Sequence, residues 1–529
     1  MVAAILRARG VAFVFLVFAG VTIGGAQVAV TTWHYDNARS GANPNETILT
    51  PLNVNSNQFG KLFTQPVDGA VIGQALYLPG VTIPGAGVHN VIYVATMHDS
   101  VYAFDADSAT GKNANPLWQI SFLTNGATPV PISLQGCAPT TQWTEVGIVS
   151  TPVIDPVSGT LYVVAKTYEN SGFVHRLHAL DVATGLEKTG SPVVITASYL
   201  FAGNNNIFVD KIQINRPALL LENGNLYIAF GSTGCRSDKE QGWVMAYNAS
   251  TLQPAGAFDD EPEDGAAAIW QRGGGLSADS QGNIYGATGD GDFAAGTNFG
   301  QSVLKLSQKG GTLQLADWFT PFNELYLDQH DLDLSEPVLV LPDQPSKHPH
   351  LLAAVGKEGT IYILNRDNLG HFCATCTLVD TQIVQELTAL APDTGALIYW
   401  NNTVYSSGAG SPIMAMPLSK GLLATKPVAQ SKIKTHGHSP VISANGSTEG
   451  VLWQLTGTYL FAFDAKTLVK LYGSSQARDG RDVFPPVPHF ANLVVANWQS
   501  LCGNQQQPGG VRIVAVIRRV NSQPLSVAD

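Results

Sequence analysis

Residues 150–185 decide the fold, and their sequence is STPVIDPVSGTLYVVAKTYENSGFVHRLHALDVATG. Short runs of apolar, β-branched and aromatic residues alternate there with segments that contain Pro, Gly or Asp. Such runs are typical of β-strands, and Pro and Gly mark the turns between them. We therefore expect three short strands at 151–154, 161–165 and 175–180.

The same order of strand, turn and strand recurs along the chain. Three first-strand positions each precede a tyrosine of the next strand by nine or ten residues: Pro152 and Tyr162, Pro217 and Tyr227, Leu276 and Tyr285. Repeats of four short strands joined by tight turns are typical of a β-propeller. The prediction is an all-β, eight-bladed β-propeller of four-stranded antiparallel sheets. Seven blades are the alternative, because the unit at 395–430 is irregular.

The two ends of the chain differ from the repeats. Residues 1–26 combine Arg7 and Arg9 with a short apolar run and small residues, which predicts a cleaved signal peptide rather than a membrane anchor. We expect a secreted or periplasmic protein with an N-terminal extension at 27–58, the propeller at 59–502 and an irregular tail at 503–529. A lone strand at 60–67 is expected to close the last blade.

The composition excludes some partners. The formal net charge of the 529 residues is −11, and loss of Arg7 and Arg9 with the signal peptide makes it more negative. A net acidic surface argues against nucleic acid and against anionic membranes. The expected partner is therefore a protein, a glycan or a small molecule, with no stable membrane insertion.

All five cysteines lie in the exported part, where disulfides are permitted. They are Cys137, Cys235, Cys373, Cys376 and Cys502. Cys373 and Cys376 have C-x-x-C spacing without the His of a haem attachment motif, which predicts a local disulfide, with a redox-active pair as the alternative. Pairing of Cys137 with Cys235 is left open. Because five is an odd number, at least one cysteine has no partner within the chain.

One set of polar residues precedes the first strands of successive units. In a propeller these strands line the central channel, and their entry ends meet at one mouth, so the set is expected to surround a shared binding site. Its members are Gln74, Thr151, Asn215, Arg216, Glu336 and His438. The alternative is that Arg216 and Glu336 only neutralise one another.

Two acidic loops provide candidate metal ligands. Asp290 and Asp292 follow the second strand of the fourth unit, and Asp331 and Asp333 precede the fifth unit. Calcium prefers several oxygen ligands at close spacing, and both loops offer them. The alternative is that both are solvated acidic turns.

The third-strand turns carry a family resemblance. Residues 179–185, ALDVATG, resemble the A-L-D-x-x-T-G core of the PQQ-type propeller repeat, and residues 103–111 followed by Trp118 are similar. The chain from Tyr35 onward also resembles a secreted bacterial subgroup with such repeats. The resemblance implies that Asp and Gly form the turn between the third and fourth strands, and that Trp docks between blades.

The resembled family contains quinoprotein alcohol dehydrogenases as well as outer-membrane assembly lipoproteins that bind protein. A dehydrogenase of this family needs calcium, the cofactor pyrroloquinoline quinone (PQQ), an Asp base and often a ring of two adjacent cysteines. This chain has no adjacent cysteine pair and no Cys after the signal peptide. The first hypothesis is therefore a binding or scaffold propeller with its site at the channel mouth. The second is a calcium- and PQQ-dependent dehydrogenase.

Overall fold

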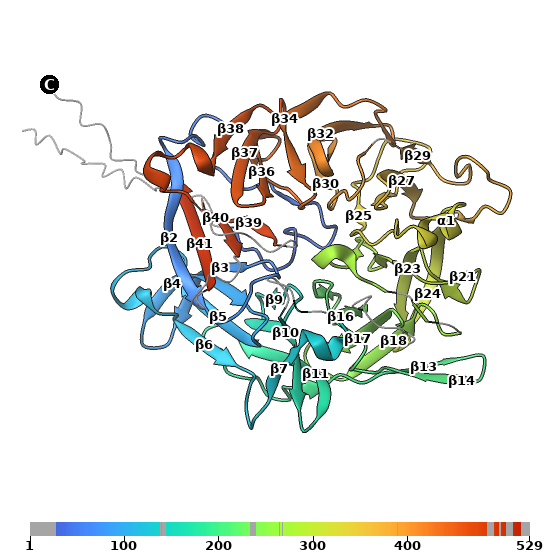
Figure 1. The fold of residues 1–529 in the computed structure, drawn as a ribbon, viewed down its shortest axis with the longest axis horizontal. Helices are drawn as coiled ribbons and strands as arrows, with labels where there is room; N and C mark the ends of the chain where they lie inside the picture. The colour runs from blue at the N-terminus through green and yellow to red at the C-terminus, as the bar shows by residue number, and fades with distance from the viewer. Residues whose placement is uncertain are drawn as a thin grey trace, which may run out of the picture.

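The chain forms an all-β propeller, a ring of twisted sheets around a central axis, as the computed structural model shows (Figure 1). The model describes residues 28–137, 139, 144–232, 240–263, 265–266, 268–388, 390–483, 491–496, 499–503 and 512–519. The predicted signal peptide at 1–26 lies outside these residues. In the described part of the chain, no helix is long and apolar enough to cross a membrane.

Seven blades, rather than the predicted eight, are each built from consecutive strands of one continuous segment, in the antiparallel order that the repeats predict. The first blade consists of β3 (Leu76–Ile83), β4 (Gly87–Ala95), β5 (Ser100–Asp105) and β6 (Trp118–Ser121). The second consists of β9 (Val153–Asp155), β10 (Thr160–Glu169), β11 (Gly172–Asp181) and β12 (Val193–Val194). The third consists of β15 (Leu220–Glu222), β16 (Asn225–Phe230), β17 (Trp243–Asn248) and β18 (Pro254–Asp259). The fourth blade consists of β19 (Ser277–Ala278), β20 (Ile284–Ala287), β23 (Val303–Lys309) and β24 (Thr312–Thr320). The fifth consists of β25 (Leu339–Val340), β26 (Leu351–Val355), β27 (Thr360–Asn365) and β29 (Gln385–Thr388). The sixth blade consists of β30 (Ile398–Trp400), β31 (Thr403–Ser407), β32 (Ala409–Ser419) and β34 (Ala429–His436). The seventh consists of β35 (Val441–Asn445), β36 (Thr448–Thr456), β37 (Tyr459–Asp464) and β38 (Lys470–Gly473).

A further four-stranded sheet combines the two ends of the chain. Its order is β2 (Phe59–Val67), β41 (Arg512–Arg519), β40 (Gln499–Gly503) and β39 (Leu493–Ala496). Phe59 pairs with Arg519 and Val67 pairs with Arg512 in the antiparallel contact of β2 with β41. The tail at 503–529 was expected to be irregular, and β41 corrects this expectation, because strand β2 from the N-terminal end supplies its pairing partner.

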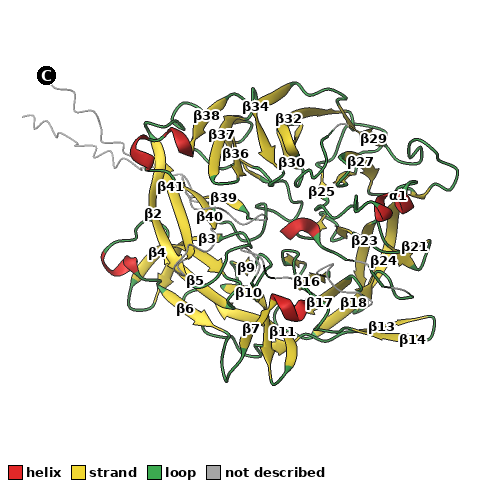
Figure 2. Ribbon diagram, in the orientation of Figure 1, coloured by secondary structure: helices red, strands yellow, loops and turns green. Residues whose placement is uncertain are grey.

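Smaller elements decorate the blades. The additional strands are β7 (Thr128–Pro131), β8 (Glu145–Val146), β13 (Ser198–Phe201), β14 (Asn204–Ile207), β21 (Phe293–Ala294), β22 (Asn298–Phe299), β28 (His371–Phe372) and β33 (Leu422–Leu423). The helices are α1 (Glu324–Gln329) and the short 3-10 turns η1 (Gly111–Ala114), η2 (Ile132–Gln135), η3 (Gln271–Gly273), η4 (Ser474–Gln476) and η5 (Arg478–Gly480). Figure 2 shows these helices between the strands, with β13 and β14 projecting from the ring.

The N-terminal segment at 30–46, which we call the inner belt, follows the innermost strands of the blades. Its Val30 pairs with Tyr77 of the first blade, and its strand β1 (Ala42–Asn43) pairs in parallel with β35 of the seventh. Between these ends, backbone bonds join it to four more blades: Ile154 N to Thr31 O, Ala278 N to Asn37 O, Val340 N to Ala38 O and Tyr399 N to Ser40 O. The Asn37 amide donates to the Leu221 carbonyl of the third blade. The inner belt thereby occupies the free hydrogen-bonding edges of the innermost strands.

The repeat turn has the structure that the family resemblance implies. Asp181 Oδ1 accepts hydrogen bonds from the Ala183 amide and the Thr184 hydroxyl, and Gly185 has a φ of +71°. A Cβ at Gly185 would lie 2.5 Å from the Trp118 ring. Trp118 of the first blade donates to the Val182 carbonyl of the second. Both the turn and the docking of Trp between blades are confirmed here, and apolar clusters continue this packing between neighbouring sheets.

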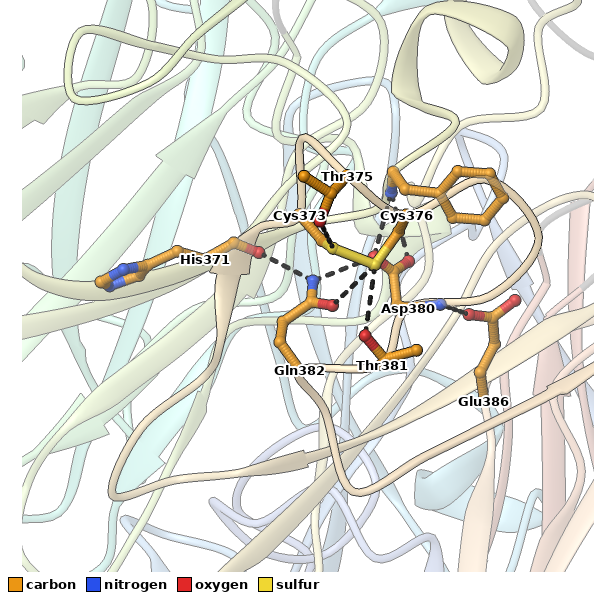
Figure 3. Close-up of a disulfide and its surroundings, with 9 residues drawn as sticks. His371, Cys373, Thr375, Cys376, Asp380, Thr381, Gln382 and Glu386 are labelled. Atoms are coloured by element: carbon orange, nitrogen blue, oxygen red, sulfur yellow. Dashed lines mark hydrogen bonds between the residues drawn. A yellow bond between two sulfur atoms is a disulfide. The ribbon is translucent and has the colours of Figure 1, made fainter.

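The predicted local disulfide joins Cys373 and Cys376 with an S–S distance of 2.02 Å (Figure 3). Gln382 lies beside it and donates to both the His371 carbonyl and Asp380 Oδ1. Cys137 is also disulfide-bonded. Cys235, whose pairing with Cys137 the sequence left open, lies outside the described residues.

Candidate functional site

Three aspartates of two loops converge beside a lysine, and we call Asp290, Asp331, Asp333 and Lys357 the acidic centre. One carboxylate oxygen of each aspartate lies within 4.8 Å of the others, a spacing that a metal ion can bridge. Lys357 Nζ lies 2.6 Å from Asp333 Oδ1 and also contacts Asp331. The acidic centre therefore has one cation for three carboxylates.

Loop ends of the fourth and fifth blades hold these side chains together. Asp290 follows β20, Asp331 and Asp333 lie between α1 and β25, and Lys357 lies in the turn between β26 and β27. The Lys357 amide donates to the Asp333 carbonyl at 2.9 Å. A Cβ at Gly289 would lie 2.6 Å from Asp333 Oδ2, so only glycine there leaves room for the carboxylate.

Burial and mutual repulsion alter the protonation of the acidic centre. Burial, together with the neighbouring Asp333, raises the pKa of Asp290 to about 7. Burial also raises the pKa of Asp333, although Lys357 acts against this. Asp290 Oδ1 is buried and has no hydrogen-bond partner among the described residues. Added positive charge would stabilise the ionised carboxylates.

Glu336 lies next to the acidic centre and is paired with Arg272. Arg272 Nη1 donates to Glu336 Oε1 at 2.9 Å, whereas Glu336 Oε2 is buried without a partner in the described residues. Burial raises the pKa of Glu336 to about 7, and the Arg272 charge only partly opposes this. The Glu336 charge in turn raises the pKa of Arg272.

The raised pKa of Glu336 predicts a loss of stability as the pH rises. Between the ordinary glutamate pKa near 4.5 and the folded value near 7, the folded state holds more protons than the unfolded state, so the free energy of unfolding falls. We expect this group to cost roughly 3 kcal/mol at pH 8 relative to pH 4.5.

Urea unfolding of the wild type and Glu336→Gln at both pH values would measure this difference. The free energy of unfolding of Glu336→Gln should differ from that of the wild type at every pH, because Arg272 loses its ion-pair partner. It should not show the fall between pH 4.5 and pH 8 that the Glu336 carboxyl causes. Parallel stability profiles for the two proteins would contradict the assignment.

Two of the predicted channel-mouth residues, Gln74 and Thr151, form hydrogen bonds at the inner belt. The Gln74 side chain accepts a hydrogen bond from the His34 amide and donates to the Thr32 carbonyl. Thr151 Oγ1 accepts from the Gln74 amide at 2.8 Å. Gln74 and Thr151 are both buried. The prediction placed them at the channel mouth because it assigned no contact between the N-terminal segment and the blades.

Asn215 and Arg216 are also buried in backbone contacts. Asn215 Nδ2 donates to the Ala229 carbonyl at 2.8 Å. Arg216 donates to the carbonyls of Val149 and Arg272. The alternative in which Arg216 neutralises Glu336 is wrong, because Arg272 is the cation that pairs with Glu336.

Glu336 and His438 are brought together, as predicted. They line one small cavity of about 20 Å³ with Arg272, Ser439 and Asn492. This volume suits a water molecule and not an organic ligand. The acidic centre, and not the ring of pre-strand residues, is therefore the stronger candidate site.

The acidic centre brings together three of the four predicted metal ligands. Asp290, Asp331 and Asp333 converge, whereas Asp292 is not part of the group. Asp292 is exposed, and its amide donates to Glu261. Lys357 and Arg272 were missed. Lys357 lies in a Gly-Lys-Glu-Gly turn directly after an apolar strand, and a positive residue in such a turn was the available signal.

Comparison with known proteins agrees with this fold. No protein-family model and no curated protein sequence matches the chain. Quinohemoprotein alcohol dehydrogenase from Comamonas testosteroni superposes with a TM-score of 0.60 at 15% identity, over 93% of this chain and 81% of that one. Quinohemoprotein alcohol dehydrogenase ADHIIG from Pseudomonas putida HK5 has a TM-score of 0.60 at 12% identity, over 95% and 82%.

A europium-containing methanol dehydrogenase gives a TM-score of 0.53 at 14% identity, over 84% of this chain and 85% of that one. The superpositions show that the chain shares the propeller fold of these enzymes. At identities this low, they show the fold alone. Activity has to be argued from the residues of the site itself.

Proposed function

We propose that this chain is a PQQ-type propeller that binds a divalent cation at the acidic centre together with a quinone cofactor, and that it oxidises an alcohol. The convergence of Asp290, Asp331 and Asp333 beside Lys357 carries the proposal. The fold shared with the alcohol and methanol dehydrogenases supports it.

The residues of the acidic centre fit a cation and an anionic cofactor. Asp290 Oδ1 and Glu336 Oε2 are buried carboxylate oxygens that have no hydrogen-bond partner in the described part of the chain. Such oxygens are costly unless a cation or a donor binds them. Calcium takes carboxylate ligands of this kind. Lys357 and Arg272 would face the carboxylates of PQQ, because ammonium and guanidinium groups bind such oxygens.

The cofactor and the chain would have different tasks. When bound, a quinone accepts the two electrons and two protons that an alcohol releases as it becomes a carbonyl compound. The chain's own carboxylates bind the cation, and one of them accepts the hydroxyl proton. Binding of the cation would lower the pKa of Asp290 from about 7 and keep this ligand ionised at neutral pH.

The proposal also covers where the protein acts and how the propeller ring closes. We infer that it acts after export, as a secreted or periplasmic protein. We also infer that β2 from the N-terminal end closes the ring, and its pairing with β41 supports this.

Calorimetric titration of the mature protein with PQQ and CaCl₂ tests the function. We expect saturable heat only when both are present. We also expect a melting temperature higher by about 2–3 °C at a ligand concentration 100 times the dissociation constant, because a ligand specific for the folded state stabilises it.

Each ligand alone is the control. Heat and a raised melting temperature with PQQ in the presence of EDTA would show binding that does not use the acidic centre. No heat and no shift with both ligands would overturn the dehydrogenase, and would leave the binding or scaffold propeller as the function to pursue by partner capture.

A further inference from the structure

A second cavity lies far from the acidic centre in the sequence, at the junction of the first and second blades. Its volume is about 470 Å³, within the range of small-molecule sites. β10 and β11 pair over ten residues and form one wall. The end of β6 and the following turn at 122–125 form the other, before β7 pairs with Thr167 and Tyr168 of β10.

A neutral histidine is held in one orientation at the base of this cavity. His178 is buried, and its Nδ1 lies 2.6 Å from Glu187 Oε1. Burial lowers the pKa of His178 against the effect of Glu187, so the ring is neutral near pH 7. Because a carboxylate only accepts hydrogen bonds, Nδ1 carries the proton, and Nε2 is left as an acceptor.

The other charged groups of the cavity are already hydrogen-bonded to neighbouring side chains. Arg176 contacts the Glu169 carboxylate and donates to Thr167 Oγ1 at 3.3 Å. Glu187 also accepts from the Ser191 hydroxyl. One arginine against two carboxylates leaves the cavity with a net negative charge, which disfavours anionic ligands.

An aromatic surface completes the cavity. Phe122 stacks on His178 with ring centroids 3.7 Å apart and also lines the cavity. Asn125 and Thr124 of the same turn add an amide and a hydroxyl at the rim. A ligand must therefore offer many hydroxyl donors and acceptors, an apolar face and no negative charge.

We propose that this cavity binds a neutral saccharide of one or two rings. Carboxylate oxygens of Glu169 and Glu187 and His178 Nε2 accept bonds from its hydroxyls, Arg176 donates to its oxygens, and Phe122 packs on a C–H face. The site is independent of the proposed redox function, since it uses none of the residues of the acidic centre.

Calorimetric titration with glucose, galactose, mannose, maltose and cellobiose tests the proposal. At least one sugar is expected to bind saturably, with a dissociation constant on the order of 0.1–1 mM for a ligand of this size. Glu187→Gln should weaken that sugar at least 10-fold, because the variant loses an acceptor and releases His178 from its tautomer.

Glu449→Gln is the matched control, since Glu449 is exposed at the start of β36 in the seventh blade. This variant should bind the sugar as tightly as the wild type does. Absence of heat with all five sugars would overturn the proposal, as would equal affinity of Glu187→Gln and wild type. Tighter binding of glucuronate than of glucose would overturn the neutral class. PQQ and calcium binding by Glu187→Gln should stay unchanged, which separates this site from the acidic centre.

Discussion

Replacing Asp333 with Asn is expected to weaken binding of a divalent cation to this protein by about 100-fold, because a neutral amide takes the place of the central charged ligand. Asp333 is 4% exposed, and its carboxylate lies within bridging distance of Asp290 and Asp331. Removal of its charge also leaves Lys357 with only the exposed Asp331 as a close ion-pair partner among the described residues.

Asp292→Asn is the matched control, because Asp292 belongs to the loop of Asp290 but lies outside the acidic centre. It should bind calcium as the wild type does. Calorimetric titration with CaCl₂ at pH 7.5 in the presence of PQQ measures both variants, and circular dichroism melting curves show that both are folded. Equal losses in the two variants would indicate a general effect of surface charge and contradict the assignment of Asp333.

Replacing Arg39 with Ala is expected to lower the free energy of unfolding by about 3–5 kcal/mol. Arg39 is 1% exposed. Its guanidinium donates to Thr32 Oγ1 and to the carbonyls of Trp33 and Leu276. The alanine variant removes the donor of these buried oxygens and the side-chain bond that joins the inner belt to the Leu276 carbonyl. Burial lowers the pKa of Arg39 to about 10, so relief of its own desolvation offsets part of this loss.

Arg478→Ala is the control for Arg39, because Arg478 is exposed and its removal should change the stability by less than about 0.5 kcal/mol. Urea unfolding followed by tryptophan fluorescence measures both variants. A loss below about 1 kcal/mol in Arg39→Ala would show that the inner belt does not contribute to the stability of the ring.

The local features of the fold were predictable from the sequence. The turn at 181–185 forms because Asp181 caps its own backbone and Gly185 accepts a positive φ, both properties of adjacent residues. The disulfide of Cys373 and Cys376 follows from their spacing of three. The inner belt was not predictable, because it contains no strand periodicity and takes its conformation from the strand edges that it covers.

The candidate site was predictable only in part. Oxygen-rich loops indicated Asp290, Asp331 and Asp333, since calcium ligands are recognisable by residue type. Asp292 was wrongly included because neighbouring residues in a loop point in different directions. The pairing of Glu336 with Arg272 instead of Arg216 depends on distances between blades, which sequence spacing does not give.

The sequence by itself determined the strands, their turns and the repeat that makes a propeller, because these depend on interactions between residues close in the chain. Only the tertiary structure decided which side chains meet. Closure of the ring places Asp290, Asp333 and Lys357 of two blades in contact and buries Gln74, Thr151 and Arg216 under the inner belt and backbone. Burial and charge at that contact then set the pKa of Asp290 near 7, which no single loop determines.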